Sequence, residues 1–237
     1  MKKITFLTLI LMGLNGMAQN VMTPELLWKL GRVSPLGISN DGKNIVYQVT
    51  IPSVEENKSN SKFYTIPLNG GNATELTDTK TLVKDKNISP DGKYLVYNEE
   101  VKTEQILGKD LYPNLEKSDV QVYNGLNYRH WDTWNEGLTS HVFYKENKAD
   151  AVGIDITKGE NFDSPQKPFG GDEDYIWSKD GKSIFYVSKK KEGTAYAIST
   201  NTDIYEYNLA TGKTINRTEK NLGYDMAPQI SPTGDLT

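Results

Sequence analysis

Residues 88–97 of the 237-residue chain read ISPDGKYLVY, and the chain contains four versions of this stretch. The other three are ISNDGKNIVY at 38–47, WSKDGKSIFY at 177–186 and ISPTGDL at 230–236. Asp followed by Gly favours a tight turn, because Gly accepts a positive φ and the Asp side chain bonds nearby backbone. The alternating apolar and aromatic residues that follow are typical of a half-buried strand. Each copy therefore predicts a hairpin corner followed by a strand.

A second pattern repeats in register with the first. The stretch 63–71 reads FYTIPLNGG and the stretch 204–212 reads IYEYNLATG. In both, the last Gly comes seven positions after a Tyr, and a Thr comes six positions after that Gly. Two patterns that keep the same spacing indicate a true structural repeat.

The spacing of the repeats indicates the architecture. From Gly42 to Gly92 is 50 residues and from Gly181 to Gly234 is 53, whereas Gly92 to Gly181 is 89. Repeats of about 40 to 50 residues with about four strands each are typical of β-propeller blades. The long middle interval predicts one blade that carries an insertion.

We therefore expect an all-β fold, a partial β-propeller of WD40-like blades that spans residues 33–237. About four to eight blades are needed to close a ring, and an open end exposes an unpaired strand edge, so the chain is expected to be a truncated one. The expected blades are 33–77, 88–157 with an insertion at 101–127, 175–218, and the start of another at 228–237.

The first 32 residues are expected to be a leader and a short helix. Residues 1–19 combine Lys2 and Lys3, an apolar run and small residues near Ala18, which is typical of a bacterial secretory signal peptide. An exported protein, periplasmic or secreted, with no membrane span after cleavage, is the expectation. In the helical lead-in 20–32, Thr23 is suited to cap a helix that Pro24 begins. The remainder is expected to be strand-like, with a polar loop at 54–60.

Composition excludes several classes of function. The chain has 27 basic and 31 acidic residues, without the basic stripe of a nucleic-acid surface, so no nucleic-acid partner is expected. It has no Cys, which excludes disulfides, thiolate nucleophiles and thiolate metal sites. Its 14 Tyr residues suit a strand-rich fold.

No motif for nucleophilic catalysis is recognisable in this sequence. No Gly-x-Ser-x-Gly motif occurs, and the only histidines are His130 and His141, expected on two strands of one hairpin. A metal site that combines them with Asp132 lacks any compact ligand motif, and histidines hydrogen-bonded locally within the sheet are favoured. We expect no catalytic residue, no metal and no cofactor in this chain.

The most unusual local sequence is RHWDTW at 129–134. A cation and two Trp so close together suit recognition of a peptide by charge and aromatic contact. The favoured alternative is that alternate side chains pack between neighbouring blades. The candidate substrate-binding residues are Arg129, His130, Trp131, Asp132 and Trp134.

These motifs resemble two groups of proteins. The Ser-Pro-Asp-Gly-Lys repeats resemble those of TolB and of the prolyl oligopeptidase family of serine peptidases. The opening TPELLWKLGRVS at 23–34, the block 128–134 with SHVF at 140–143, and PFGGDEDYIWS at 168–178 are similar to the acylaminoacyl-peptidase and dipeptidyl-peptidase 5 branch. This resemblance covers nearly all of the chain after the leader.

The resemblance implies that a C-terminal α/β-hydrolase domain, absent from these 237 residues, carries the Ser, Asp and His. The propeller would gate and orient peptide substrates for that domain and be inactive alone. Both exopeptidase and oligopeptidase activity stay open. One alternative is a non-enzymatic, TolB-like propeller that docks an envelope protein. Another is a short β protein that closes its ring as a homo-oligomer.

Overall fold

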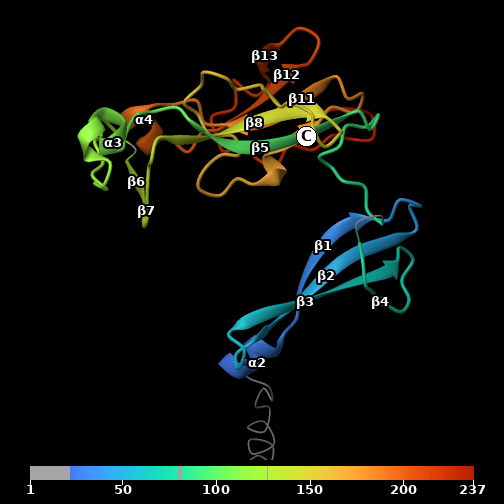
Figure 1. Cartoon of the computed structure of the whole chain (residues 1–237). Coiled ribbons are helices and arrows are strands. Elements are labelled where there is room, and N and C mark those ends of the chain that lie inside the picture. The colour runs from blue at the N-terminus through green and yellow to red at the C-terminus, as the bar shows by residue number, and fades with distance from the viewer. Residues whose placement is uncertain (1–21, 80–81, 127) are drawn as a thin grey trace, which may run out of the picture. The chain divides into compact units, whose positions relative to one another are not determined.

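The computed structural model describes residues 22–79, 82–126 and 128–237. The chain divides into two compact units, one up to Lys84 and one from Asp85 to Thr237. Figure 1 shows the elements of each unit, which are described separately below.

The first unit is a helix followed by a four-stranded antiparallel meander. Helix α2 (Pro24–Lys29) is capped as expected, since Thr23 Oγ1 accepts a hydrogen bond from the Leu26 amide at 3.2 Å. The strands lie in the order β1-β2-β3-β4. The expected polar loop is shorter than predicted, because β3 already begins at Lys58. The strands are β1 (Arg32–Ile38), β2 (Asn44–Ser53), β3 (Lys58–Pro67) and β4 (Thr74–Leu76).

The second unit contains a meander of the same kind, in the order β10-β11-β12-β13. One short helix, α4 (Gly193–Ile198), interrupts it between the second and third strands. The expectation of strands alone was wrong here, because this segment has two Ala, a strong helix former, and no alternation. The strands are β10 (Tyr175–Trp177), β11 (Ser183–Ser188), β12 (Asp203–Asn208) and β13 (Lys213–Asn216).

The other sheet of this unit has the order β5-β8-β9, formed by Tyr94–Lys102, Leu138–Glu146 and Ile154–Asp155. Strand β5 pairs with β8 along its whole length, from Tyr94 opposite Glu146 to Lys102 opposite Leu138. The prediction that residues 128–134 supply a strand of this blade was therefore wrong, and the excursion runs from 103 to 137. Trp131 explains the error, because its φ of 50° cannot occur within a continuous strand.

The excursion contains two short helices and a small hairpin. The helices are α3 (Gly108–Leu111) and the 3-10 turn η1 (Pro113–Leu115), and the hairpin pairs β6 (Arg129–His130) with β7 (Thr133–Trp134). A second 3-10 turn, η2 (Asp172–Asp174), leads into β10. The irregular character expected of the insertion is confirmed.

The Asp-Gly corners have one geometry. In the second copy, Ser89 Oγ accepts from the Tyr94 amide at 2.9 Å and donates to Asp91 Oδ1 at 2.7 Å. The Asp91 carboxylate also accepts from the Lys93 amide, and Gly92 has a φ of 77°. The first and third copies repeat these bonds, at Ser39, Asp41, Asn44, Ser178, Asp180 and Ser183.

A stacked aromatic pair follows each of these three corners at the same distance along the chain. The pairs are directly opposite in strand register, and their ring centroids are 5.5 to 5.6 Å apart. Such cross-strand pairs stabilise a sheet and fix which residues face each way. The pairs are Tyr47 with Tyr64, Tyr97 with Phe143, and Tyr186 with Tyr205.

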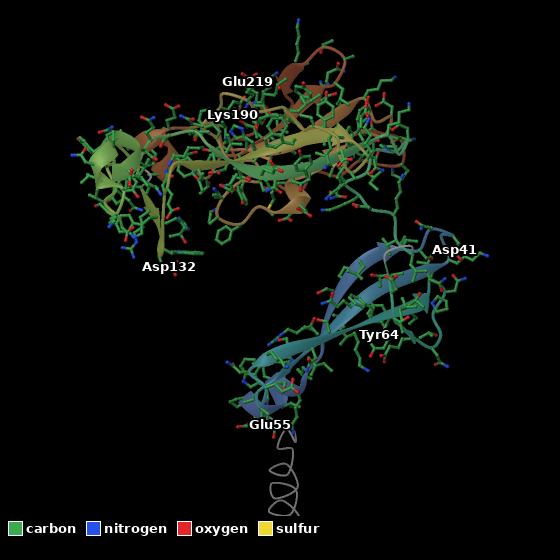
Figure 2. All side chains as sticks on the ribbon, viewed as in Figure 1. Asp41, Glu55, Tyr64, Asp132, Lys190 and Glu219 are labelled. Atoms are coloured by element: carbon green, nitrogen blue, oxygen red, sulfur yellow. The ribbon has the colours of Figure 1, made fainter. Side chains whose placement is uncertain are left out.

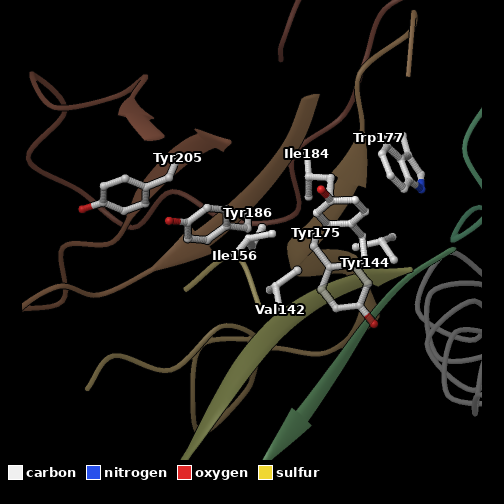
Figure 3. Close-up of a cluster of buried hydrophobic side chains, with 9 residues drawn as sticks. Val142, Tyr144, Ile156, Tyr175, Trp177, Ile184, Tyr186 and Tyr205 are labelled. Carbon is white, nitrogen blue, oxygen red and sulfur yellow. The ribbon is translucent and has the colours of Figure 1, made fainter. Parts of the chain in front are cut away.

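The main core lies in the second unit, between its two larger sheets (Figure 3). Val96 and Val142 of the β5-β8-β9 sheet and Ile184 of β11 are fully buried. Trp177 is buried as well, and its indole N–H donates to the Asn87 carbonyl at 2.8 Å. The core also includes Tyr144, Ile156, Tyr175, Tyr186 and Tyr205.

The corner at Asp91 gives a prediction on pH. The Lys93 ammonium, first, and the Ser89 hydroxyl, second, hold the pKa of Asp91 at about 2, below its ordinary 3.8. Replacing Lys93 with Gln should raise this pKa, as measured by carboxyl-carbon NMR titration. Because the folded-state pKa is depressed, the stabilisation by Asp91 is complete above the unfolded pKa and is lost as the pH falls through about 2.

The first corner supplies the control. The pKa of Asp41 is lowered chiefly by the Ser39 hydroxyl, with the charge of Lys43 a smaller cause. Lys43→Gln should therefore change the pKa of Asp41 less than Lys93→Gln changes that of Asp91. Equal shifts at the two corners would contradict this account.

Candidate functional site

The β6–β7 hairpin is held at the end of the β5-β8-β9 sheet by a few specific contacts. The Asn135 amide donates to the Tyr128 carbonyl at 2.9 Å, which closes the base of the hairpin. The Gly137 carbonyl accepts from the amides of Thr103 and Glu104. Gly137 has a φ of 78°, and a Cβ there would lie 2.2 Å from the Glu104 carbonyl oxygen, so only Gly fits.

The rings of Tyr123, Tyr128 and Trp134 form a cluster that includes one hairpin strand residue. The ring centroid of Tyr123 lies 5.6 Å from that of Tyr128 and 6.1 Å from that of Trp134. The Tyr123 hydroxyl donates to the Asn135 carbonyl at 2.8 Å and lies 3.0 Å from Gln121 Oε1. Burial, and to a smaller degree the charge of Glu136, raises the pKa of Tyr123, so this hydroxyl keeps its proton and remains a donor.

The Arg129 guanidinium lies over the Trp134 ring, 5.0 Å from its centroid. This is the geometry of a cation–π contact, which attracts the cation to the face of the indole. Arg129 and Trp134 are directly opposite each other in the hairpin register. The hairpin therefore presents a cation and a large ring as one unit.

Two hollows lie on this surface. One, of about 440 Å³, is lined by Tyr123, Gly125, Leu126, Tyr128 and Trp134. The other, of about 480 Å³, shares Leu126, Tyr128 and Trp134 with the first and adds Arg129 and Trp131. Each is large enough for one or two amino-acid side chains and is walled mainly by rings. We name these two hollows and their lining residues the aromatic surface.

The tip of the hairpin is well exposed (Figure 2, at the label for Asp132). Trp131 is 71% exposed; its ring contacts His130 at 4.6 Å and, edge to face, Phe169 at 5.6 Å. Phe169 is itself 66% exposed and comes from the segment before η2. Two wide rings that remain largely in contact with solvent are a common feature of binding surfaces.

The five sequence-predicted candidates are thus placed close together but differ in position. Arg129, Trp131 and Trp134 line the hollows, whereas His130 and Asp132 do not. All five are exposed in this structure, and packing between neighbouring blades, the alternative favoured from the sequence, stays a prediction.

Sequence reasoning missed Tyr123, Leu126 and Phe169 as members of this region, and Tyr128 was noted only as part of a motif. The run YNGLNY at 123–128 was read as a sequence of turn formers. Its two Tyr, five residues apart and next to RHWDTW, were the available signal.

The two histidines do not belong to one hairpin, contrary to the prediction. His141 lies in β8, opposite Glu99 of β5, and is 1% exposed. Its Nδ1 is 2.8 Å from Asp155 Oδ2 and its Nε2 is 3.0 Å from the Glu160 carbonyl oxygen. His141 is a hydrogen-bonded sheet residue, as expected, but its partners are not local, since they lie 14 and 19 residues further along the chain. In the described part of the chain, no three His, Cys, Asp or Glu side chains gather as a metal site.

Removing the Tyr123 hydroxyl should loosen the hairpin. Tyr123→Phe keeps the ring but leaves the Asn135 carbonyl without this donor, a loss of about 1 kcal/mol. We expect roughly fivefold faster hydrogen exchange at the Asn135 amide, which donates to the Tyr128 carbonyl at the base of the hairpin, measured by NMR. Tyr112→Phe, in the same excursion but 54% exposed, is the matched control and should change nothing. Unchanged exchange in Tyr123→Phe would contradict this role.

Comparison with known proteins finds relatives that are similar over most of this chain. Dipeptidyl-peptidase 5 of Porphyromonas gingivalis is 35% identical over 260 aligned residues, which cover 90% of this chain and 38% of that protein. Dipeptidyl-peptidase 5 of Porphyromonas endodontalis is 34% identical over 261 residues, with 91% and 38% covered. The chain therefore spans about 38% of the length of these curated relatives.

No family model matches the chain. The solved structure of acylaminoacyl peptidase from Pyrococcus horikoshii covers 82% of this chain, and the chain covers 40% of it, at 13% identity and a TM-score of 0.40. The likeness rests on the two sequence relatives. Over nine tenths of its length, the chain is similar to proteins named dipeptidyl-peptidase 5, in agreement with the resemblance that the sequence motifs indicated.

Proposed function

We propose that this chain is the peptide-capturing propeller part of an exported serine peptidase. In this proposal the aromatic surface receives a peptide and orients it for a hydrolase domain that lies in the remainder of a longer protein. The curated relatives are peptidases by name and are more than twice as long as this chain, which supports the proposal.

One observation carries the proposal: the juxtaposition of two ring-walled hollows with a cation on a surface excursion. Trp134 and Tyr128 border both hollows, and Arg129 stacks on Trp134. Aromatic and Arg side chains contribute most of the free energy at recognition surfaces, because they combine a large apolar area with polar groups. A peptide fits this surface better than a sugar phosphate or a nucleotide, since most of its lining residues are aromatic or aliphatic and only one of them is a cation.

The position of the aromatic surface suits a gating role. It belongs to a 35-residue excursion, 103–137, that leaves a regular sheet at the end of β5 and rejoins it at β8. Binding residues are often carried on such excursions, because the scaffold fixes their ends while their sequence is free to vary. The sheet would then position the excursion, and the excursion would select the peptide.

Export is part of the proposal and rests on residues 1–19, which lie outside the described residues. None of the helices among residues 22–79, 82–126 and 128–237 is long and apolar enough to cross a membrane. We expect cleavage after Ala18 or Gln19, found by mass spectrometry of the exported protein. An intact leader on the exported protein would contradict cleavage.

The proposal predicts that peptide binding depends on Trp134. Trp134→Ala removes a ring shared by both hollows and the platform under Arg129. We expect the dissociation constant for short Phe-containing peptides to increase about tenfold, as measured by isothermal titration calorimetry on the whole chain. Trp28→Ala is the matched control: Trp28 is similarly exposed and also lies under an Arg, but in the first unit.

The outcomes separate the alternatives. Equal loss of binding in both Trp variants, or no peptide binding by the unmodified chain, would overturn capture at the aromatic surface. Binding of a folded envelope protein instead of peptides would favour the non-enzymatic propeller. Peptide hydrolysis by the isolated chain, blocked by a serine-directed inhibitor, would refute the need for a separate hydrolase domain.

A further inference from the structure

One charged side chain is set within the aromatic surface. Arg129 is the only charged residue among the described residues that line the two hollows, and it lines the larger one. In the described part of the chain, its guanidinium has no carboxylate within ion-pair distance. Asp132, three residues further on, lies at the exposed tip of the hairpin and lines neither hollow.

The other two arginines show what distinguishes Arg129. Arg217 donates from two of its nitrogens to the Glu206 carboxylate, so its charge is already paired. Arg32 lies over a ring as Arg129 does, 5.7 Å from the centroid of Trp28, but lines neither of the two hollows. Arg129 alone combines a stacked guanidinium, the lack of a carboxylate partner and a place in a hollow.

The stacking leaves the hydrogen-bonding groups of Arg129 available. Among the described residues none accepts a hydrogen bond from the Arg129 guanidinium, whose planar set of N–H donors matches the two oxygens of a carboxylate. Leu126, Tyr128 and Trp131 line the same hollow and offer apolar contacts beside the guanidinium. Because Trp134 holds the guanidinium, less side-chain entropy is lost when an anion binds.

We propose that the larger hollow binds a peptide carboxylate on Arg129, next to an apolar side chain of the same peptide held by Tyr128 and Trp134. This inference rests on the proposed function and adds a substrate class, peptides with an accessible carboxylate. The carboxylate comes from the C-terminus of the peptide or from an Asp or Glu side chain. A preference for the C-terminus would favour short peptides, whose ends reach the hollow together with their apolar residues.

The experiment compares peptides that differ by one group. The first pair is Gly-Phe-Ala-Phe as the free acid and as the C-terminal amide. The second pair is Gly-Phe-Glu-Phe and Gly-Phe-Gln-Phe, both as amides. Dissociation constants are measured by isothermal titration calorimetry on the whole chain at low salt. We expect the carboxylate member of at least one pair to bind about three- to tenfold more tightly.

Variants of Arg129 test whether this side chain reads the carboxylate. Arg129→Gln should abolish the preference while still binding the amides, and Arg129→Glu should reverse it. Arg129→Lys should keep part of it, because Lys retains the charge but not the planar fork. Arg32→Gln is the matched control and should leave the preference unchanged. Circular dichroism on each variant shows that the fold is retained.

The results distinguish this inference from the proposed function. If the acid and amide members of both pairs bind equally, the carboxylate site is wrong and peptide capture stands. If the preference persists in Arg129→Gln, another group reads the carboxylate and the assignment to Arg129 is wrong. If none of the four peptides binds, the proposed function fails and this inference fails with it.

Discussion

The hydroxyl of one Ser in each of the first three repeats fixes the corner that directly precedes β2, β5 or β11. Ser89 is fully buried, and its hydroxyl both donates to Asp91 and accepts from the amide of Tyr94. A buried hydroxyl with both roles satisfied has little desolvation cost and leaves the chain one geometry for the turn. Because the turn fixes Tyr94 as the first residue of β5, it also fixes which side chains of the strand point to each face of the sheet, and Val96 points to the core. A strand shifted by one residue would turn that side chain to the opposite face.

This constraint acts locally, before any packing between sheets. In the first unit, Val46 is the one fully buried apolar side chain among the described residues, yet the corner and the stacked pair of Tyr47 and Tyr64 are formed as in the second unit. In the second unit the same local frame carries a shared core, where Val142 and Ile184 come from different sheets. The repeat therefore sets the form of each sheet, and the burial between sheets supplies most of the stabilisation.

The same distinction explains what the sequence could predict. Some features depend only on residues close to one another in the sequence, and these predictions are confirmed. They are the tight turn at Gly92, the helix capped by Thr23 and the pairing of consecutive strands. The excursion was predicted less well, because its structure depends on distant contacts. Tyr123 joins the hairpin through the Asn135 carbonyl, twelve residues further on, and Trp131 adopts a positive φ that its residue type does not signal. His141 is another case, since its partners were fixed only by the register of β8.

A hairpin with two residues in each strand is not stable by itself, so its order has to come from its surroundings. Here the order comes from Tyr123 beneath the rings and from Gly137 at the anchoring point, both outside the hairpin strands. The stacking of Arg129 on Trp134 then joins the two strands at their charged and aromatic side chains. Because these contacts are made by the chain's own residues, a peptide of the kind proposed above would not have to order the surface first. Its interactions with the rings and the guanidinium would then be retained as affinity, and differences among peptides at these groups would become selectivity.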